Sequence, residues 1–402
     1  MTDPALQRRL RIAYLTMRDP DDRRSWSGTL YSMAQAMEKH CGEVFRVGPL
    51  LPTSLKAGEA ISHVVRLLTG RTYLYTHTVS LSKKLGAMAE KKMSGVQCDV
   101  IFAAAASAVV AHLHTDLPIV YLSDTTLKLM VNYNAEFSNV LSPHLRMADE
   151  LERQSIAKSS RLVYPSSWAA DSAVRDYGAD RSRVSVVPFG ANLEHPPSRE
   201  EALRASGQGR CGLLFVGVYW GAKGGDIALD TLMELERLGI PSELTVVGCH
   251  PPARIGHPHL RVFPFLDKNI PDQRAQLDRL YSEAAFFILP TRAECFGIAS
   301  CEANAYGLPV VTTATGGVPE VIRDGVNGFL LPLAARGDQY AARIRDIYDN
   351  PEAYQALRAS SREQFETRLN WDAWGERVNE ILQAAATENR SEAAECGVGY
   401  ES

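Results

Sequence analysis

Short runs of apolar and β-branched residues alternate with helical patterns along most of the chain. The runs are almost continuously apolar, which is typical of parallel strands covered by helices on both faces. They lie at Arg11–Thr16, Cys98–Ala103, Pro118–Leu122, Arg161–Pro165, Val184–Pro188, Gly212–Val218, Glu243–Gly248, Leu260–Phe263, Ala285–Pro290 and Pro309–Thr312. Helical periodicity lies between them, for example over Leu30–Lys39, Leu145–Ser159, Ile227–Leu238 and Gln273–Glu283. The alternation predicts an α/β protein with two doubly wound, parallel-sheet (Rossmann-like) domains.

A stretch without apolar periodicity, Pro188–Arg210, separates the two series of runs. We therefore expect a first domain over residues 1–190 and a second over residues 191–368. A last helix is predicted over residues 369–386, followed by a polar, disordered tail over residues 387–402. Parallel sheets bind ligands beyond the carboxyl ends of their strands, so two such domains are expected to face a central cleft.

Composition excludes several classes of partner and compartment. The chain has 43 Lys and Arg against 47 Asp and Glu, a net charge of −4, which argues against nucleic-acid binding. It has no apolar run of ~18 residues, so no membrane-spanning helix is expected. The polar start of the chain lacks the apolar region of a secretory signal. Seven cysteines without a CxxC pair predict a reduced, cytoplasmic location.

The segment Ala285–Pro332 carries the most chemistry. A predicted strand is followed by a polar loop, and a helix is predicted to begin after Gly297, at Ile298. The free N–H groups at such a helix start attract an anion such as a diphosphate. Glu294 precedes this start and Glu302 lies within the helix, and carboxylates are good acceptors for sugar hydroxyls. This combination predicts a nucleotide-sugar site, whereas two such glutamates outside this context would be ordinary surface residues.

The same segment resembles the E-x7-E signature of the family 4 retaining glycosyltransferases, which have the two-domain GT-B fold. The signature is present as Glu294 and Glu302 with Phe296-Gly297 between them. Similarity to the family extends over most of the chain, through Ser27–Thr29, Tyr164–Trp168, Val187–Asn192, Thr315–Glu320, Asp324–Leu330 and Trp371. The resemblance implies that Glu294 meets the transferred sugar and Glu302 the nucleotide ribose. It also implies donor contacts from Phe296, Gly297 and Ile298, and a last helix that crosses back to the first domain.

A second loop, Gly217–Gly225, is predicted to connect a strand to a helix and to place Lys223 within reach of a diphosphate. Lys223 is suited to neutralise the leaving β-phosphate, and the loop resembles the donor-phosphate loop of the family, with Gly217 as its first glycine. The alternative is a solvated loop lysine. The family often has Arg where this chain has Val218. We therefore expect Lys223 and backbone N–H donors to stabilise the negative charge of the diphosphate, unless Arg292 or another residue compensates.

The first domain contributes two candidates. Gly28 allows a ligand to approach the backbone closely in a loop that resembles the glycine loop of the family, although a plain helix-capping turn would look the same. Asp124 follows a predicted strand at the point where the family commonly has His, and we treat it as a catalytic candidate beside Glu294 and Lys223. The alternative for Asp124 is a cap of the next helix.

Metal and cofactor motifs are weak in this sequence. Asp19-Pro20-Asp21 forms a DxD, but its arginine neighbours favour a solvated, ion-paired loop. The spacing of Cys249-His250 and His257-Pro258-His259 fits no common metal site. We therefore expect no metal and no cofactor beyond the nucleotide-sugar substrate.

The resulting prediction is a retaining glycosyltransferase that moves a sugar from a nucleoside diphosphate sugar to a hydroxyl of a sugar, lipid or small molecule. An epimerase or phosphorylase on the same scaffold is an alternative enzyme, and a non-catalytic sugar-nucleotide-binding protein is an alternative without chemistry. A lysine-rich helix around Ser80–Lys92 is compatible with peripheral contact to an acidic membrane, although a solvated face is the commoner outcome.

Overall fold

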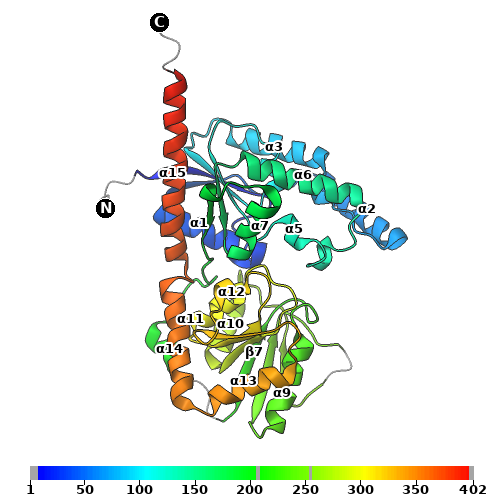
Figure 1. Cartoon of the computed structure of the whole chain (residues 1–402), viewed down its shortest axis with the longest axis vertical. Coiled ribbons are helices and arrows are strands. Elements are labelled where there is room, and N and C mark those ends of the chain that lie inside the picture. Colours follow the sequence, from blue (N-terminus) through cyan, green and yellow to red (C-terminus); the bar gives the residue numbers. More distant parts are fainter. Residues whose placement is uncertain (1–7, 205–208, 253–255, 398–402) are drawn as a thin grey trace. The chain divides into compact units, whose positions relative to one another are not determined.

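The chain folds into two compact units in a computed structural model (Figure 1). The structure describes residues 8–204, 209–252 and 256–397. The first unit combines Met1–Val187 with Trp374–Ser402, and the second is the continuous stretch Pro188–Ala373. The first division lies close to the predicted one between residues 190 and 191. The return to the first unit falls inside the predicted last helix, residues 369–386.

The first unit contains a six-stranded parallel sheet in the order β2-β1-β3-β4-β5-β6. Its strands are β1 Leu10–Thr16, β2 Gly42–Arg46, β3 Val100–Ala104, β4 Ile119–Leu122, β5 Arg161–Tyr164 and β6 Val184–Val186. Its helices are α1 Thr29–His40, α2 Ser54–Thr69, α3 Val79–Met93, α4 Ser107–Val110, α5 Leu127–Met130, α6 Ser142–Lys158 and α7 Ser167–Tyr177. Four short 3-10 segments are η2 Ser25–Gly28, η3 Tyr75–His77, η4 Ala135–Phe137 and η5 Arg181–Arg183.

The second unit repeats the plan, with a six-stranded parallel sheet in the order β12-β11-β10-β7-β8-β9. Its strands are β7 Cys211–Val216, β8 Ser242–Val247, β9 Leu260–Phe263, β10 Phe286–Leu289, β11 Val310–Thr313 and β12 Gly328–Leu331. Its helices are α8 Arg199–Leu203, α9 Gly225–Arg237, α10 Pro271–Glu283, α11 Ile298–Ala305, α12 Val318–Val321, α13 Gly337–Tyr348 and α14 Pro351–Thr367. The prediction of two doubly wound parallel-sheet domains is therefore confirmed.

Each predicted apolar run overlaps a strand, but the sequence pattern missed the strands β2 and β12. Both lie at an edge of their sheets, beside β1 and β11 respectively. β2 is less fully covered than a central strand, so it lacks the continuous apolar pattern of one. Most of β2 is half-buried or exposed accordingly.

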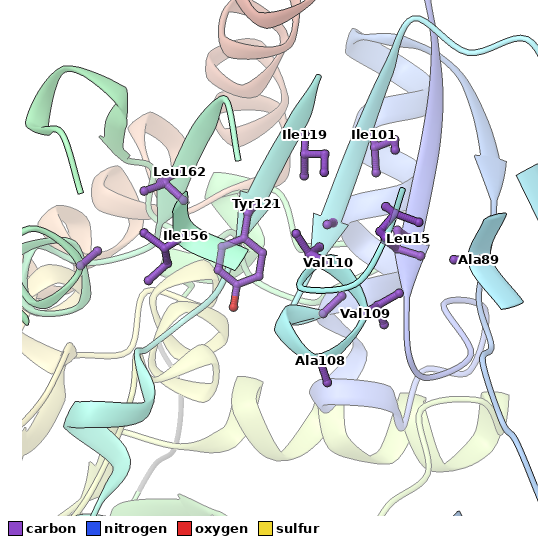
Figure 2. Close-up of a cluster of buried hydrophobic side chains, with 14 of the residues drawn as sticks. Leu15, Ala89, Ile101, Ala108, Val109, Val110, Ile119, Tyr121, Ile156 and Leu162 are labelled. Atoms are coloured by element: carbon purple, nitrogen blue, oxygen red, sulfur yellow. The ribbon is translucent and has the colours of Figure 1, made fainter. Parts of the chain in front are cut away.

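The core of the first unit lies between its sheet and the helices that cover it (Figure 2). Leu15 of β1, Ile101 of β3 and Tyr121 of β4 contribute inward-facing side chains from neighbouring strands. Ala89 of α3 and Ile156 of α6 pack against them from the helical layer. This packing holds the carboxyl ends of β1, β3 and β4 in fixed relative positions.

The last helix, α15, runs from Trp371 to Gly397. The predicted disordered tail is therefore wrong for residues 387–397, which continue the helix, while residues 398–402 lie outside the described residues. In the first unit Trp374 is buried and its ring meets the ring of Phe102 of β3 edge-on, with 5.8 Å between centroids.

Among the residues that the structure describes, no helix is long and apolar enough to cross a membrane.

Candidate active site

Three loops meet at the carboxyl ends of the second unit's central strands. They follow β7, β10 and β11 and lead into α9, α11 and α12. The N–H of Arg292 donates to the carbonyl of Ala222 at 2.8 Å, and the N–H of Gly317 donates to the carbonyl of Glu294 at 3.2 Å. At Gly224, with φ of 75°, a Cβ would lie 2.0 Å from the carbonyl oxygen of Pro290, so only glycine lets these loops approach so closely.

The two predicted catalytic groups of this unit form an ion pair. Lys223 Nζ lies 2.6 Å from Glu294 Oε2, and the two side chains are 21% and 17% exposed. Gly217 faces the stem of this lysine, because a Cβ there would lie 3.1 Å from Lys223 Cγ. The lysine is therefore held toward the loop of Glu294, as a positioned cation instead of the solvated loop residue that was its alternative.

The predicted anion site corresponds to the start of α11. Gly297 precedes the helix with φ of 108°, a left-handed conformation that suits glycine. The first N–H groups of a helix have no partner within it, so Ile298 and its neighbours offer donors at the positive end of the helix dipole. Phe296 has its ring buried against Phe189, with 5.1 Å between centroids, so only its backbone is placed to meet a donor.

Glu302 lies inside α11 and is 3% exposed. One carboxylate oxygen is paired with Lys268 Nζ, and the other accepts a hydrogen bond of 3.0 Å from the hydroxyl of Tyr281. Burial, and next the charge of Glu302, raise the pKa of Tyr281 well above its usual value. Its hydroxyl therefore stays protonated and keeps donating to the carboxylate.

Lys268 and Tyr281 were missed by sequence reasoning. Lys268 lies in a polar loop between β9 and α10, where a lysine carries no signal of its own. Tyr281 occupies an apolar position of α10 and its ring stacks on those of Phe287 and Tyr306, so the sequence marks it as an ordinary core residue. The two meet at Glu302 because α10 and α11 flank the same sheet.

Arg292 is a further cation in the β10–α11 loop. Its Nη1 atom is buried and has no hydrogen-bond partner among the described residues. Val218 is 50% exposed on the neighbouring loop and offers no charge. The expectation that Arg292 compensates for Val218 stays a prediction, and the unpartnered guanidinium nitrogen is compatible with it.

In the first unit, the loop after β1 is strained and contacts Asp124. Trp26, Ser27 and Gly28 have φ of 49°, 58° and 91°, a run of left-handed residues that is unfavourable outside glycine. Trp26 Nε1 donates to Asp124 Oδ2 at 3.1 Å. Thr126, not Asp124, occupies the N-cap position of α5. The capping alternative for Asp124 therefore does not describe the structure.

The Asp19-Pro20-Asp21 motif and the histidines 257 and 259, for which the sequence predicts no metal, contact charged residues from other elements. Asp21 pairs with Arg46 at 2.9 Å, in agreement with an ion-paired loop. His257 and His259 both pair with Glu236 of α9, which the sequence did not associate with them. The backbone N–H of His259 also donates to His257 Nδ1 at 3.2 Å. The ligand atoms that Glu236, His257 and His259 could offer lie within 4.8 Å of one another, a spacing that could hold a metal ion. The expectation that this segment binds no metal stays a prediction.

Two family models match the chain. The model described as Glycosyltransferase Family 4 matches residues 28–195, and the model described as Glycosyl transferases group 1 matches residues 210–350. The first matched segment begins at Gly28 and includes Asp124 but not Trp26 and Ser27, and the second includes the loops that follow β7, β10 and β11.

Curated relatives are similar over part of their length. A D-inositol 3-phosphate glycosyltransferase of Streptomyces coelicolor is 29% identical over 301 residues, which are 67% of this chain and 64% of that protein. One of Actinosynnema mirum is 30% identical over 285 residues, 67% of this chain and 66% of that protein. The chain thus spans less than two thirds of the length of these relatives.

Solved structures share the fold at low identity. Sucrose-phosphate synthase from Thermosynechococcus elongatus has a TM-score of 0.67 at 16% identity, covering 94% of this chain and 100% of that one. Anabaena HepE in complex with UDP and glucose has a TM-score of 0.60 at 17% identity, covering 93% and 100%. These similarities show the fold alone, which is the GT-B architecture of two Rossmann-like domains.

Proposed function

We propose that this chain, which belongs to the family 4 glycosyltransferases, moves a sugar from a nucleoside diphosphate sugar to an acceptor hydroxyl with retention of anomeric configuration. One observation carries the proposal. Two carboxylates, Glu294 and Glu302, lie on either side of the α11 start, and each is paired with a lysine from another loop. The site thus combines cations and helix N–H groups for a diphosphate with carboxylates for sugar hydroxyls.

The leaving group determines what these residues do. As the bond between the anomeric carbon and the β-phosphate oxygen breaks, negative charge grows on that oxygen. Lys223 and the N–H groups at the start of α11 stabilise this charge, and Arg292 of the β10–α11 loop is a further cation. Positioned charges of this kind lower the barrier without forming a covalent bond to the sugar.

Retention follows from attack on the face that the diphosphate leaves. The acceptor oxygen bonds to the anomeric carbon, and its proton passes to the departing phosphate oxygen, so the reaction needs no nucleophile from the protein. Positive character on the sugar in the transition state favours a nearby carboxylate, and Glu294 is the carboxylate nearest Lys223. Positioning and charge stabilisation are then the main tasks of the protein.

Glu302 is suited to bind the ribose. Its two oxygens are already aligned by Lys268 and Tyr281, so they present fixed acceptors to a pair of vicinal hydroxyls. A carboxylate that is pre-oriented in this way loses little freedom when the nucleotide binds.

No divalent metal is part of the proposal, since Lys223, Arg292 and the α11 start supply positive potential. The acceptor is a hydroxyl compound, and the relatives named D-inositol 3-phosphate glycosyltransferases make phosphorylated polyols the first class to test. UDP-glucose is the first donor to test, since HepE, of the same fold, was solved with UDP and glucose. Contact of the first unit with an acidic membrane also remains a proposal.

A donor screen tests this function directly. Thermal unfolding of the full chain is followed with UDP-, GDP-, ADP- and dTDP-sugars, because a ligand at a hundredfold excess over its Kd stabilises the native state by ~2.7 kcal/mol. The donor that stabilises the chain is then incubated with candidate acceptors, and the anomeric configuration of the product is read by NMR. Stabilisation without transfer to any acceptor would favour a non-catalytic binding protein, and sugar interconversion without an acceptor would favour an epimerase.

A further inference from the structure

Helix α2 of the first unit is the least covered long helix among the described residues. None of its residues is buried. It rests on η3 through a narrow stripe, in which Ser62 Oγ donates to the carbonyl of Tyr73 at 3.0 Å and Gly58 faces the ring of Tyr75. In Figure 1 it lies at the outer edge of the first unit, beyond α3. Leu55, at its start, packs partly buried against the core of the first unit, and most of the other residues of α2 are exposed.

The open surface of α2 is apolar. Ile61, Val64, Leu67 and Leu68 are 52%, 52%, 74% and 80% exposed, and Leu51, just before the helix, is 66% exposed. Positions 61, 64 and 68 follow the i, i+3, i+7 spacing, which places them on one side of the helix. Globular proteins rarely expose so many large apolar side chains on one element, and such a patch marks an interaction surface.

The charges around this face indicate its partner. Between residues 51 and 93 the chain has seven Lys or Arg and only two Glu, although its net charge is −4. Lys56 and Arg66 are exposed on α2 itself, and Arg71 is exposed just after it. The lysines of α3, at positions 83, 84, 91 and 92, are also exposed. The local surface is thus cationic around an apolar stripe.

We propose that α2 docks the first unit on the surface of an anionic lipid bilayer, with the side chains of Ile61, Val64, Leu67 and Leu68 inserted among the lipids. A helix with an apolar face and a cationic border lies in the plane of a bilayer interface, where burial of apolar surface and attraction to acidic head groups act together. A protein partner or a second copy would bury the same leucines, but neither explains the cationic border in a chain of net negative charge. This inference does not depend on the proposed transferase activity.

Vesicle sedimentation with the purified full chain tests this inference. We expect the chain to sediment with vesicles of phosphatidylcholine and phosphatidylglycerol, to bind vesicles of phosphatidylcholine alone much less, and to dissociate at high salt. Leu67→Ser with Leu68→Ser should lower the partition coefficient about tenfold or more, since both side chains leave the lipid. Lys56→Gln with Arg66→Gln should lower it about fivefold per charge on anionic vesicles.

Matched controls separate docking from misfolding. Met233→Ser with Leu333→Ser replaces two comparably apolar residues, 44% and 45% exposed, in the second unit and should leave the partition coefficient unchanged. Circular dichroism should show that each variant keeps the wild-type unfolding midpoint. Hydrogen exchange of wild-type peptides covering residues 54–69 should slow when anionic vesicles are added.

Two outcomes would overturn the inference. The first is a wild-type chain that binds neither kind of vesicle. The second is a concentration-dependent dimer in sedimentation velocity, without vesicle binding, that Leu67→Ser with Leu68→Ser dissolves. That second result would assign the face to a second copy of the chain.

Discussion

The indole Nε1 of Trp26 donates a hydrogen bond to Oδ2 of Asp124 at 3.1 Å. The bond joins the loops that follow β1 and β4, at the carboxyl edge of one sheet. It fixes one carboxylate oxygen of Asp124 and leaves the group half-buried. The strained backbone of Trp26, with φ of 49°, is therefore coupled to the placement of a charged side chain.

Asp124→Asn should lower kcat by ~100–1,000-fold if the carboxylate stabilises positive character on the sugar or orients the acceptor. The amide oxygen can still accept from Trp26, so folding and nucleotide affinity should change little. Trp26→Phe is the matched variant, because it removes the donor and keeps the charge, and it should cost much less activity. A rate for Asp124→Asn within threefold of wild type at saturating substrates would remove Asp124 from the active site.

Glu302→Ala should weaken nucleotide binding, measured by calorimetry, because the ribose loses a charged acceptor worth ~1.5–3 kcal/mol. The variant also leaves Lys268 and Tyr281 without their shared partner, so its unfolding midpoint should fall. Tyr281→Phe removes only the hydroxyl and serves as the control, with a smaller loss of affinity. Unchanged donor affinity in Glu302→Ala would show that Glu302 is not the ribose ligand.

Lys223→Met should lower kcat by ~100–1,000-fold with a smaller effect on donor Kd, because the leaving phosphate loses its cation during bond breaking. Lys268→Met, at the other lysine–carboxylate pair, should instead act mainly on donor Kd. Single-turnover rates and calorimetry on both variants distinguish these effects. Equal losses of kcat in the two variants would contradict separate roles for the pairs.

Transfer should proceed at full rate in EDTA, because the positive potential comes from side chains and the α11 start. The assay compares EDTA-treated enzyme with and without added Mg²⁺ or Mn²⁺. Activity lost in EDTA and restored by either ion would revive a metal role for Asp19 and Asp21.

Glu152 of α6 should make stability depend on pH. Burial raises its pKa from 4.5 to about 7, so the native state holds a proton that the unfolded state releases. The stabilisation is complete below pH 4.5 and is lost as the pH rises toward 7, up to roughly 3 kcal/mol. The difference in unfolding free energy between wild type and Glu152→Gln, measured from pH 4 to 8, should follow this course. A difference that is flat across this range would show that Glu152 titrates normally.

Much of the fold could be predicted because buried parallel strands have a strong apolar signature. The edge strand β2 was missed because its residues are only partly covered, and β12 because its four residues follow directly on a glycine turn. The helical end of α15 was missed because its polar composition resembles a disordered tail.

The candidate site likewise has residues that could be predicted from the sequence and residues that could not. Glu294, Gly297 and Glu302 could be found because they lie within one strand–loop–helix segment with a recognisable spacing. Lys268 could not, because only the folded sheet brings the β9–α10 loop to Glu302. The partnership of Trp26 with Asp124 was likewise invisible, since it joins positions 98 residues apart.

The division of the first unit into two stretches of chain determines the order in which the molecule can be completed. Trp374, Val378 and Leu382 are buried in that unit, and the ring of Trp374 covers Phe102 of β3. These residues are synthesised after the whole second unit, which is one unbroken stretch. On the ribosome the first unit therefore emerges before the second but completes its core after it. A fragment ending at Val187 would lack Trp374 and leave the ring of Phe102 without this contact, as an apolar surface that chaperones can bind.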